Sequence, residues 1–138
     1  MDRGERRRIL VVDDSGLVRQ LAHVALDTIG GWEVLPAESG VEALEQADAE
    51  QPEAILLDVV MPGMDGFAAL AALRAKPTTA HIPVILVTAK DKPADRQRAE
   101  SLGASGMIAK PFAVEELAGQ VAAVLGWDPS TGSSGSSS

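Results

Sequence analysis

Residues 9–14 read Ile9-Leu10-Val11-Val12-Asp13-Asp14, a short apolar run that ends abruptly in two acids. A run that is apolar at every position is typical of a strand buried on both faces of a parallel sheet. Four more such runs follow, at Val34-Leu35, Ala54 to Leu57, Val84 to Val87 and Met107 to Ala109. The segments between them carry apolar residues three and four positions apart: Leu17, Leu21 and Val24; Val41 and Leu44; Phe67, Leu70 and Leu73; and Leu117, Val121 and Val124. This alternation predicts an α/β fold in which five βα units build a doubly wound five-stranded parallel sheet with five helices.

Helix-start signals agree with this assignment. Ser39 precedes the second helical segment and Asp65 the third, and both residue types cap helix N-termini. The fourth segment, from Pro93 to Leu102, begins with a residue favoured in a first helical turn, but it has few apolar residues: Ala94, Ala99 and Leu102. Because it can bury little surface, we expect it to be the most weakly anchored helix.

Composition excludes several classes of function. The chain has 138 residues, with 12 Lys and Arg against 20 Asp and Glu, which gives a formal net charge of −8. This acidic balance and an aromatic content of 3% argue against direct nucleic-acid binding. The absence of cysteine rules out disulfides and zinc–thiolate sites, and no apolar stretch reaches the ~18 residues needed to cross a membrane. We therefore expect a cytoplasmic protein that does not bind membranes.

The two ends of the chain differ from its middle. Residues 1–7 include three of the four arginines of the first eight positions, and residues 130–138 contain only Ser, Thr and Gly. We expect one folded domain over residues 8–127. A flexible basic leader (1–7) would precede it, and a flexible Ser/Gly tail (128–138), either a linker or a remnant of cloning, would follow it.

Polar residues follow four of the five predicted strands directly: Asp13 and Asp14, Asp58, Thr88, and Lys110. The carboxyl ends of parallel strands meet at one edge of the sheet, where ligands bind, so these side chains are expected to converge. Taken singly, each residue has an ordinary explanation, as a helix cap, a strand former or a solvated charge. Their occurrence together at four strand ends favours a functional site.

If Asp13, Asp14 and Asp58 converge at this edge, their three negative charges need positive charge nearby. At ~4 Å and an effective dielectric near 20, each like-charge pair costs roughly 4 kcal/mol. Lys110 can neutralise one charge, and a divalent cation can answer the other two. Because the ligands are all oxygens, Mg²⁺ is favoured over zinc or copper.

These parts suit phosphoryl transfer. Asp58 is the expected nucleophile because it stands alone after its strand, whereas Asp13 and Asp14 are adjacent and suited to holding the metal. Thr88 and Lys110 would each contact a phosphoryl oxygen. No Gly-rich phosphate loop of the P-loop type occurs in the chain, so nucleotide hydrolysis is not indicated.

Four stretches resemble the response-regulator receiver domain of two-component signalling, in the chemotaxis-regulator-like superfamily: Ile9-Leu10-Val11-Val12-Asp13-Asp14-Ser15, Leu57-Asp58-Val59-Val60-Met61-Pro62-Gly63-Met64-Asp65-Gly66, Pro83-Val84-Ile85-Leu86-Val87-Thr88-Ala89 and Ala109-Lys110-Pro111-Phe112. The resemblance spans about residues 8 to 126. It implies a flavodoxin-like fold with strand order 2-1-3-4-5.

The resemblance also implies roles for the strand-end residues. Asp58 matches the phosphoacceptor, which receives its phosphoryl group from a histidine kinase or a histidine phosphotransfer protein within a phosphorelay. Asp13 and Asp14, with Asp58 and the backbone carbonyl of Val60, match the Mg²⁺ ligands. The implied chemistry is limited to self-phosphorylation from a phosphodonor and autodephosphorylation. Val60 and Lys90 match positions that tune the lifetime of the acyl phosphate.

The same resemblance identifies Thr88 and Lys110 as the pair that senses the phosphoryl group, and it implies a cis peptide bond before Pro111. One switch position departs from the family pattern, because Met107 stands where Tyr or Phe is usual. A flexible thioether can fill the same space but has no ring to turn inward.

The leading hypothesis is a switch in which phosphorylation of Asp58 changes the surface of the fourth helix, fifth strand and fifth helix to control an unknown output partner. A second hypothesis, motivated by Met107, is a receiver-like scaffold that docks partners without phosphorylation. A third is a flavodoxin-like FMN protein, disfavoured because Asp13 and Asp14 would repel the FMN phosphate.

Overall fold

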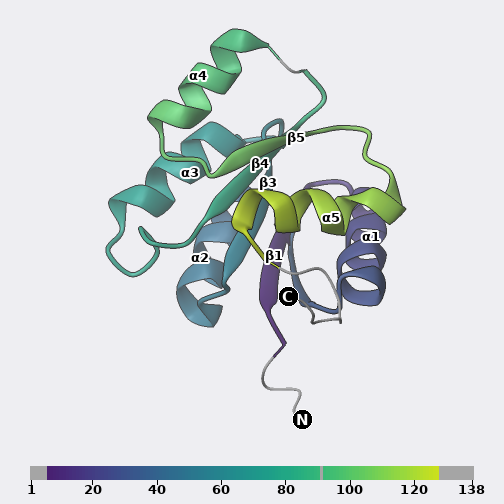
Figure 1. Ribbon diagram of the computed structural model, residues 1–138. Coiled ribbons are helices and arrows are strands. Elements are labelled where there is room, and N and C mark those ends of the chain that lie inside the picture. The colour runs from purple at the N-terminus through teal and green to yellow at the C-terminus, as the bar shows by residue number, and fades with distance from the viewer. Residues whose placement is uncertain (1–5, 91, 128–138) are drawn as a thin grey trace.

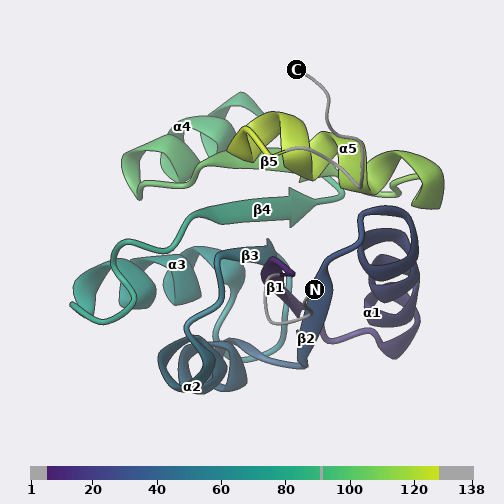
Figure 2. The ribbon, with the colours of Figure 1, turned by 60° about the horizontal axis from the view of Figure 1, so that its bottom comes forward.

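One parallel sheet organises the molecule, which we describe from a computed structural model over residues 6–90 and 92–127 (Figures 1 and 2). In this part of the chain the strand order is β2-β1-β3-β4-β5, and every neighbouring pair is parallel. The strands are β1 (Arg8–Val12), β2 (Glu33–Ala37), β3 (Ala54–Asp58), β4 (Val84–Thr88) and β5 (Gly106–Ala109). The predicted flavodoxin-like fold and strand order are confirmed.

The helices form a layer on each face of this sheet. Helices α1 and α5 cover one face, helices α2 and α3 the other, and α4 lies above α3 beside the edge strand β5 (Figure 1). Their bounds are α1 (Gly16–His23), its π-helical continuation η2 (Val24–Ile29), α2 (Gly40–Glu50), α3 (Gly66–Ala75), α4 (Pro93–Ser101) and α5 (Val114–Leu125). Within the described ranges, no helix combines the length and apolar character needed to span a bilayer.

Alternate residues of the strands fill two separate cores. Leu10 and Val12 of β1 pack with α2 and α3, whereas Ile9 and Val11 pack with α1 and α5. The central strands β3 and β4 are buried at every position, as the apolar runs predicted. Strand β2 lies at the margin of the sheet, where Pro36, which has no N–H to donate, is tolerated.

Local signals place the helix starts correctly. The Ser39 hydroxyl accepts the Glu42 N–H at 3.1 Å, and Asp65 Oδ1 accepts the Ala68 N–H at 2.8 Å. The apolar residues that marked α1, however, are not the ones that this helix buries. Leu17 is 67% exposed, and the face of α1 and η2 that packs into the core consists of smaller or later residues: Ala22, Ala25 and Leu26.

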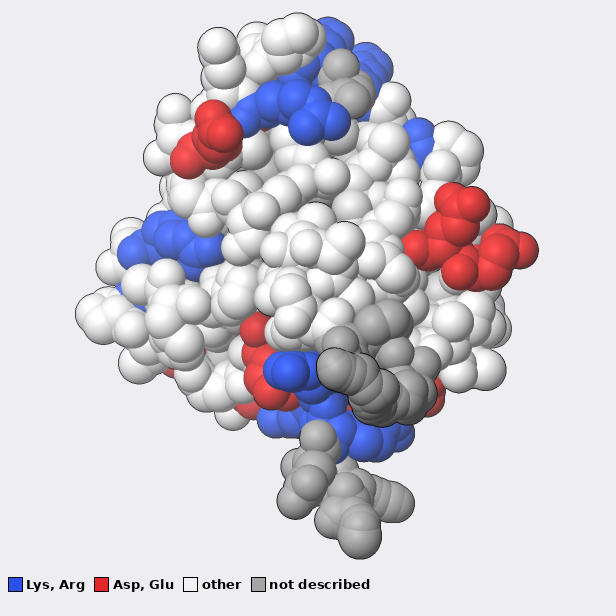
Figure 3. Space-filling view, viewed as in Figure 1, with Lys and Arg blue, Asp and Glu red and all other residues white. Residues whose placement is uncertain are grey.

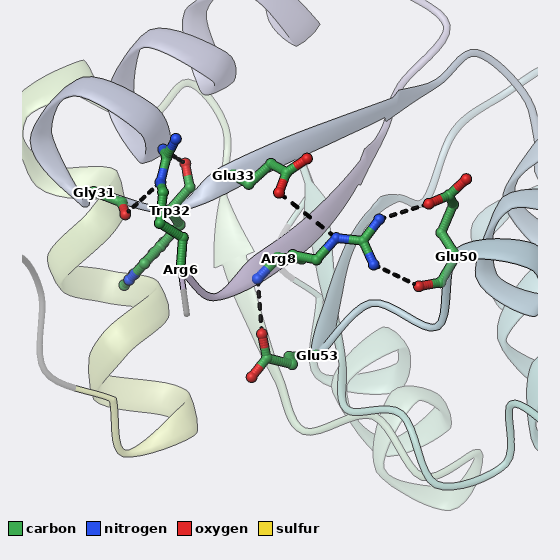
Figure 4. Close-up of polar contacts among 7 residues, drawn as sticks. All are labelled: Arg6, Arg8, Gly31, Trp32, Glu33, Glu50 and Glu53. Carbon is green, nitrogen blue, oxygen red and sulfur yellow. Dashed lines mark hydrogen bonds and ion pairs between the residues drawn. The ribbon is translucent and has the colours of Figure 1, made fainter. Parts of the chain in front are cut away.

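The arginines of the N-terminal segment contact the domain at the end of the sheet where the strands begin (Figure 4). Arg6 donates to the carbonyls of Gly31 and Trp32 and pairs with Asp27 at 2.9 Å. Arg8 donates to the Glu50 carboxylate at 2.6 Å and to its carbonyl oxygen at 2.8 Å. Acidic and basic side chains accordingly lie together at the lower end of the surface in Figure 3.

Residues 6 and 7, which belong to the predicted leader, also contact the folded domain. The Arg7 guanidinium lies 4.6 Å from the centre of the Trp127 ring, and the Trp127 ring meets Trp32 edge-to-face at 5.1 Å. The remainder of the predicted leader, residues 1–5, and the predicted tail, residues 128–138, lie outside the described residues.

Candidate functional site

Two buried carboxylates meet where adjacent strands end. Asp13 directly follows β1 and Asp58 ends β3, and these strands pair in register with Val12 opposite Leu57. Both aspartates are only 3% exposed, whereas Asp14 is exposed. One carboxylate oxygen from each of the three residues lies within 4.8 Å of the other two. The structure therefore brings the three predicted acids into one cluster.

Lys110 supplies the positive charge of this cluster. Its Nζ lies 3.0 Å from Asp13 Oδ2 and 3.1 Å from Asp58 Oδ1, so that it bridges the two buried carboxylates. The residue directly follows β5, and its N–H donates to the Thr88 carbonyl at 2.8 Å, which continues the pairing with β4. The peptide bond between Lys110 and Pro111 is cis.

Asp13 is held at both its side chain and its backbone. Its Oδ1 accepts the Ser15 N–H at 2.9 Å, and its own N–H donates to the Ala37 carbonyl at 3.1 Å. Arg19, one turn into α1, donates through Nη1 to the Asp13 carbonyl at 2.7 Å. No sequence pattern points to Arg19, because an arginine that binds a backbone carbonyl has no partner side chain to reveal it.

Burial and neighbouring groups both shift the pKa values of the two central residues, Asp58 and Lys110. Burial raises the pKa of Asp58, and the neighbouring Asp13 charge raises it further, although Lys110 and the Val60 N–H oppose the shift. Burial alone would lower the pKa of Lys110, but its hydrogen bonds to Asp13 and Asp58 outweigh this, and the net pKa is raised. The protonated lysine is therefore held firmly, while the Asp58 charge is only partly compensated.

The donor set fits a hard divalent cation. Three carboxylates converge, one of them exposed, and the group contains neither cysteine nor histidine. Oxygen ligands of this kind suit Mg²⁺. Val60 lies two residues after Asp58 and is 68% exposed, with its N–H directed to the Asp58 carboxylate.

Thr88 lies beside the cluster with its hydroxyl engaged elsewhere. It is the last residue of β4 and 3% exposed, and in the sheet Val87 pairs with Asp58 while Thr88 pairs with Ala109. Its hydroxyl lies 3.1 Å from both the carbonyl oxygen and the backbone nitrogen of Lys90. The side chain is therefore tied to the loop that leads to α4 in this structure.

Gly66 presses the start of α3 against the backbone of Asp58. A Cβ atom at this position would lie 2.4 Å from the Asp58 carbonyl oxygen and 2.7 Å from Val59 Cα. The Gly66 N–H also donates to the Val59 carbonyl at 2.8 Å. The sequence signal for this contact is a glycine directly after the Asp65 cap.

Two hollows lie beside β5, one next to the site at the carboxyl end of the strand and the other along α4. A cavity of about 310 Å³ lies between α1 and the end of β5 and is lined mainly by apolar groups: Val18, Leu21, Ala89, Lys110, Pro111 and Phe112. A second, of about 290 Å³, separates α4 from β5, and the half-buried Met107 lines it together with polar residues of α4. Met107 therefore lies beside α4.

A family model for the response regulator receiver domain matches residues 9–122. The chain belongs to the response regulator receiver family. This receiver is 40% identical over 118 residues to the response regulator MprA of Mycobacterium ulcerans. The aligned region covers 86% of this chain and 50% of MprA. It is 47% identical over 105 residues to the response regulator PleD of Caulobacter vibrioides. That aligned region covers 76% of this chain and 23% of PleD. The chain thus spans about half, or less, of the length of these relatives.

Solved structures of receivers share the fold along nearly their whole length. The chemotaxis protein CheY4 of Vibrio cholerae superimposes with a TM-score of 0.81 at 34% identity, covering 86% of this chain and 98% of that one. A response regulator from Chloroflexus aurantiacus superimposes with a TM-score of 0.80 at 33% identity, covering 88% of this chain and 99% of that one. Receivers of this family bind Mg²⁺ at an acidic aspartate cluster, are phosphorylated by histidine kinases and link to output domains.

Proposed function

We propose that this receiver is a phosphorylation-dependent switch in which Asp58 accepts a phosphoryl group from a histidine kinase or a histidine phosphotransfer protein. The observation that carries the proposal is the contact of the buried Asp58 carboxylate with Lys110 at 3.1 Å, within a cluster of three acids. A fold that served only as a scaffold would gain nothing from this arrangement, because buried, partly compensated charge is destabilising.

The proposed transfer makes one bond and breaks one. An Asp58 carboxylate oxygen forms a bond to phosphorus, the bond from phosphorus to the donor nitrogen breaks, and the electron pair stays with the leaving imidazole. Lys110 remains protonated and offsets the charge of the product. Asp13, Asp14, Asp58 and the Val60 carbonyl would hold Mg²⁺, which when bound offsets charge on the phosphoryl oxygens. In the later hydrolysis, a water oxygen forms a bond to phosphorus, the bond from phosphorus to the Asp58 oxygen breaks, and inorganic phosphate leaves as the carboxylate is regenerated.

Thr88 would couple this chemistry to the surface. Its hydroxyl must leave the backbone of Lys90, 3.1 Å away, before it can donate to a phosphoryl oxygen. Because Lys90 lies in the loop that precedes α4, the exchange of partners releases that loop. The surface of α4, β5 and α5 is the part of the receiver that would change for the output partner.

The rim of the site is apolar, which suits docking of a donor protein. Leu17 at the start of α1 is 67% exposed, and Val60, two residues after Asp58, is 68% exposed. The mainly apolar cavity beside Lys110 extends this rim. We propose that the phosphodonor covers these residues while its histidine reaches Asp58.

The alternative is a scaffold that binds partners without phosphorylation, and its motivation is Met107 in place of the usual aromatic residue. Incubation with acetyl phosphate and Mg²⁺, followed by intact-mass measurement, separates the two. The switch predicts the added mass of one phosphoryl group, lost in Asp58→Asn and retained in the control Asp48→Asn, since Asp48 pairs with Lys76 on another surface. No added mass in the wild-type protein supports the scaffold.

A further inference from the structure

Helix α4 has little apolar attachment to the rest of the receiver. Of its nine residues only Ala99 is buried, and its N-cap, Lys92, makes no side-chain capping bond. The predicted weak anchoring of this helix agrees with these contacts. Other interactions must therefore determine where α4 rests when Asp58 is unmodified.

Two arginines join α4 and its following turn to α3. Arg74 of α3 donates through Nη2 to the Gly103 carbonyl at 2.9 Å, just beyond the C-terminal end of α4. Arg98 of α4 reaches back, and its guanidinium carbon lies 4.3 Å from the centre of the Phe67 ring. Phe67 is 4% exposed and Arg98 is exposed, so the cation covers the outer face of a buried ring.

The ring that Arg98 covers lies close in sequence and in space to the acceptor. Phe67 follows Gly66, where an added Cβ would lie 2.4 Å from the Asp58 carbonyl oxygen, so the helix backbone approaches Asp58 closely at this residue. The first turn of α3 therefore touches Asp58 at one residue and α4 at the next. This connection does not pass through Met107, whose side chain lacks the usual ring.

We propose that the Arg98–Phe67 contact holds α4 in its resting position and is broken when Asp58 is phosphorylated, which makes Arg98 a positioning residue of the switch. The inference rests on the proposed function. The Arg74 bond keeps the C-terminal end of α4 in place, so release of the loop before α4 tilts the helix about that end. Arg98 lies five residues, roughly 7 Å along a helix axis, from Gly103 and moves with the tilt.

The test uses Arg98→Gln and two measurements. Beryllofluoride, a tetrahedral analogue of an aspartyl phosphate, is titrated with Mg²⁺ and followed by ¹⁹F NMR, and backbone hydrogen exchange of α4 is followed by mass spectrometry. A solvent-exposed cation–π contact corresponds to about a two- to fivefold change in an equilibrium. We expect Arg98→Gln to tighten apparent beryllofluoride binding and to accelerate α4 exchange by that factor, because the resting state loses a contact that the activated state lacks.

Lys92→Gln is the matched control, since it removes the same charge from the same segment without touching Phe67. Both measurements should stay at wild-type values in this control. In a Phe67→Leu background, which keeps the core apolar, Arg98→Gln should have no further effect. An unchanged affinity or an unchanged exchange rate in Arg98→Gln overturns the proposal. A wild-type protein that takes up no beryllofluoride instead overturns the switch itself, and with it the role of Arg98.

Discussion

Replacing Lys110 by methionine should tighten Mg²⁺ binding to the acidic cluster. The lysine Nζ bridges Asp13 and Asp58 at 3.0 and 3.1 Å, so it occupies the same carboxylates that a metal would use. Methionine has a similar length and no charge. The variant therefore removes a competitor and a repelling cation while it leaves all three carboxylates in place.

The size of the effect follows from the geometry. A cation bound to the oxygen that Lys110 contacts would lie at most about 5 Å from Nζ, given metal–oxygen distances of about 2.1 Å. A divalent and a monovalent cation at that distance repel by roughly 1.7 kcal/mol in bulk water and by roughly 7 kcal/mol at an effective dielectric of about 20. Since Lys110 is 21% exposed, the lower figure sets the minimum, and we expect at least about a tenfold increase in affinity.

Isothermal titration calorimetry with MgCl₂ on metal-stripped protein measures this change directly. Lys76→Met is the control, because Lys76 pairs with Asp48 at 2.9 Å and makes no contact with the cluster, so its affinity should equal that of the wild type. A Lys110→Met protein that is folded by circular dichroism but binds Mg²⁺ equally or more weakly would refute the electrostatic account of the site.

Three further predictions concern the residues around Asp58. In EDTA, Asp58→Asn should raise the free energy of unfolding at pH 7, because burial and Asp13 raise the pKa of Asp58 in the folded protein. This gain in stability should shrink as the pH falls and vanish below the pKa of about 4 that an aspartate has in the unfolded chain. A difference in urea denaturation that does not change with pH would contradict this. Gly66→Ala should destabilise the folded protein by about 1–3 kcal/mol, because the new Cβ meets the Asp58 carbonyl. The control Gly119→Ala should stabilise it by about 0.5–1 kcal/mol, because a Cβ at this position of α5 meets nothing within 4 Å. Equal denaturation midpoints for the two variants would exclude the clash. The acyl-phosphate half-life, followed by loss of the added mass, should change in Val60→Asn and in Lys90→Glu, and an unchanged half-life in both would remove these residues from control of hydrolysis.

Much of the fold was readable from local pattern. Strands buried on both faces need apolar residues at every position, so their runs are visible without any knowledge of neighbours. The caps at Ser39 and Asp65 are equally local, since each side chain binds an N–H three residues away. The acidic cluster and Lys110 could be predicted because parallel strands bring their carboxyl ends to one edge.

The sequence was a weaker guide wherever the partner of a residue is a backbone group or a distant element. Apolar spacing located α1 but indicated the wrong face. Leu17 is exposed, and the buried residues are Ala22, Ala25 and Leu26, which share a helical face next to the one that the larger apolar residues marked. The predicted basic leader includes Arg6, yet Arg6 pairs with Asp27 of η2, an acid that only folding brings near it.

For this protein the sequence by itself determined the five strands, their buried character, the helix starts and the residue types that meet at the edge of the sheet. Each of these depends either on short-range spacing or on the rule that the carboxyl ends of parallel strands lie at one edge. Only the tertiary structure decided that Gly66 touches the backbone of Asp58 and that Arg98 lies over the ring of Phe67. Those contacts join elements through backbone atoms and ring faces, which carry no pattern along the chain and exist only once the layers have packed.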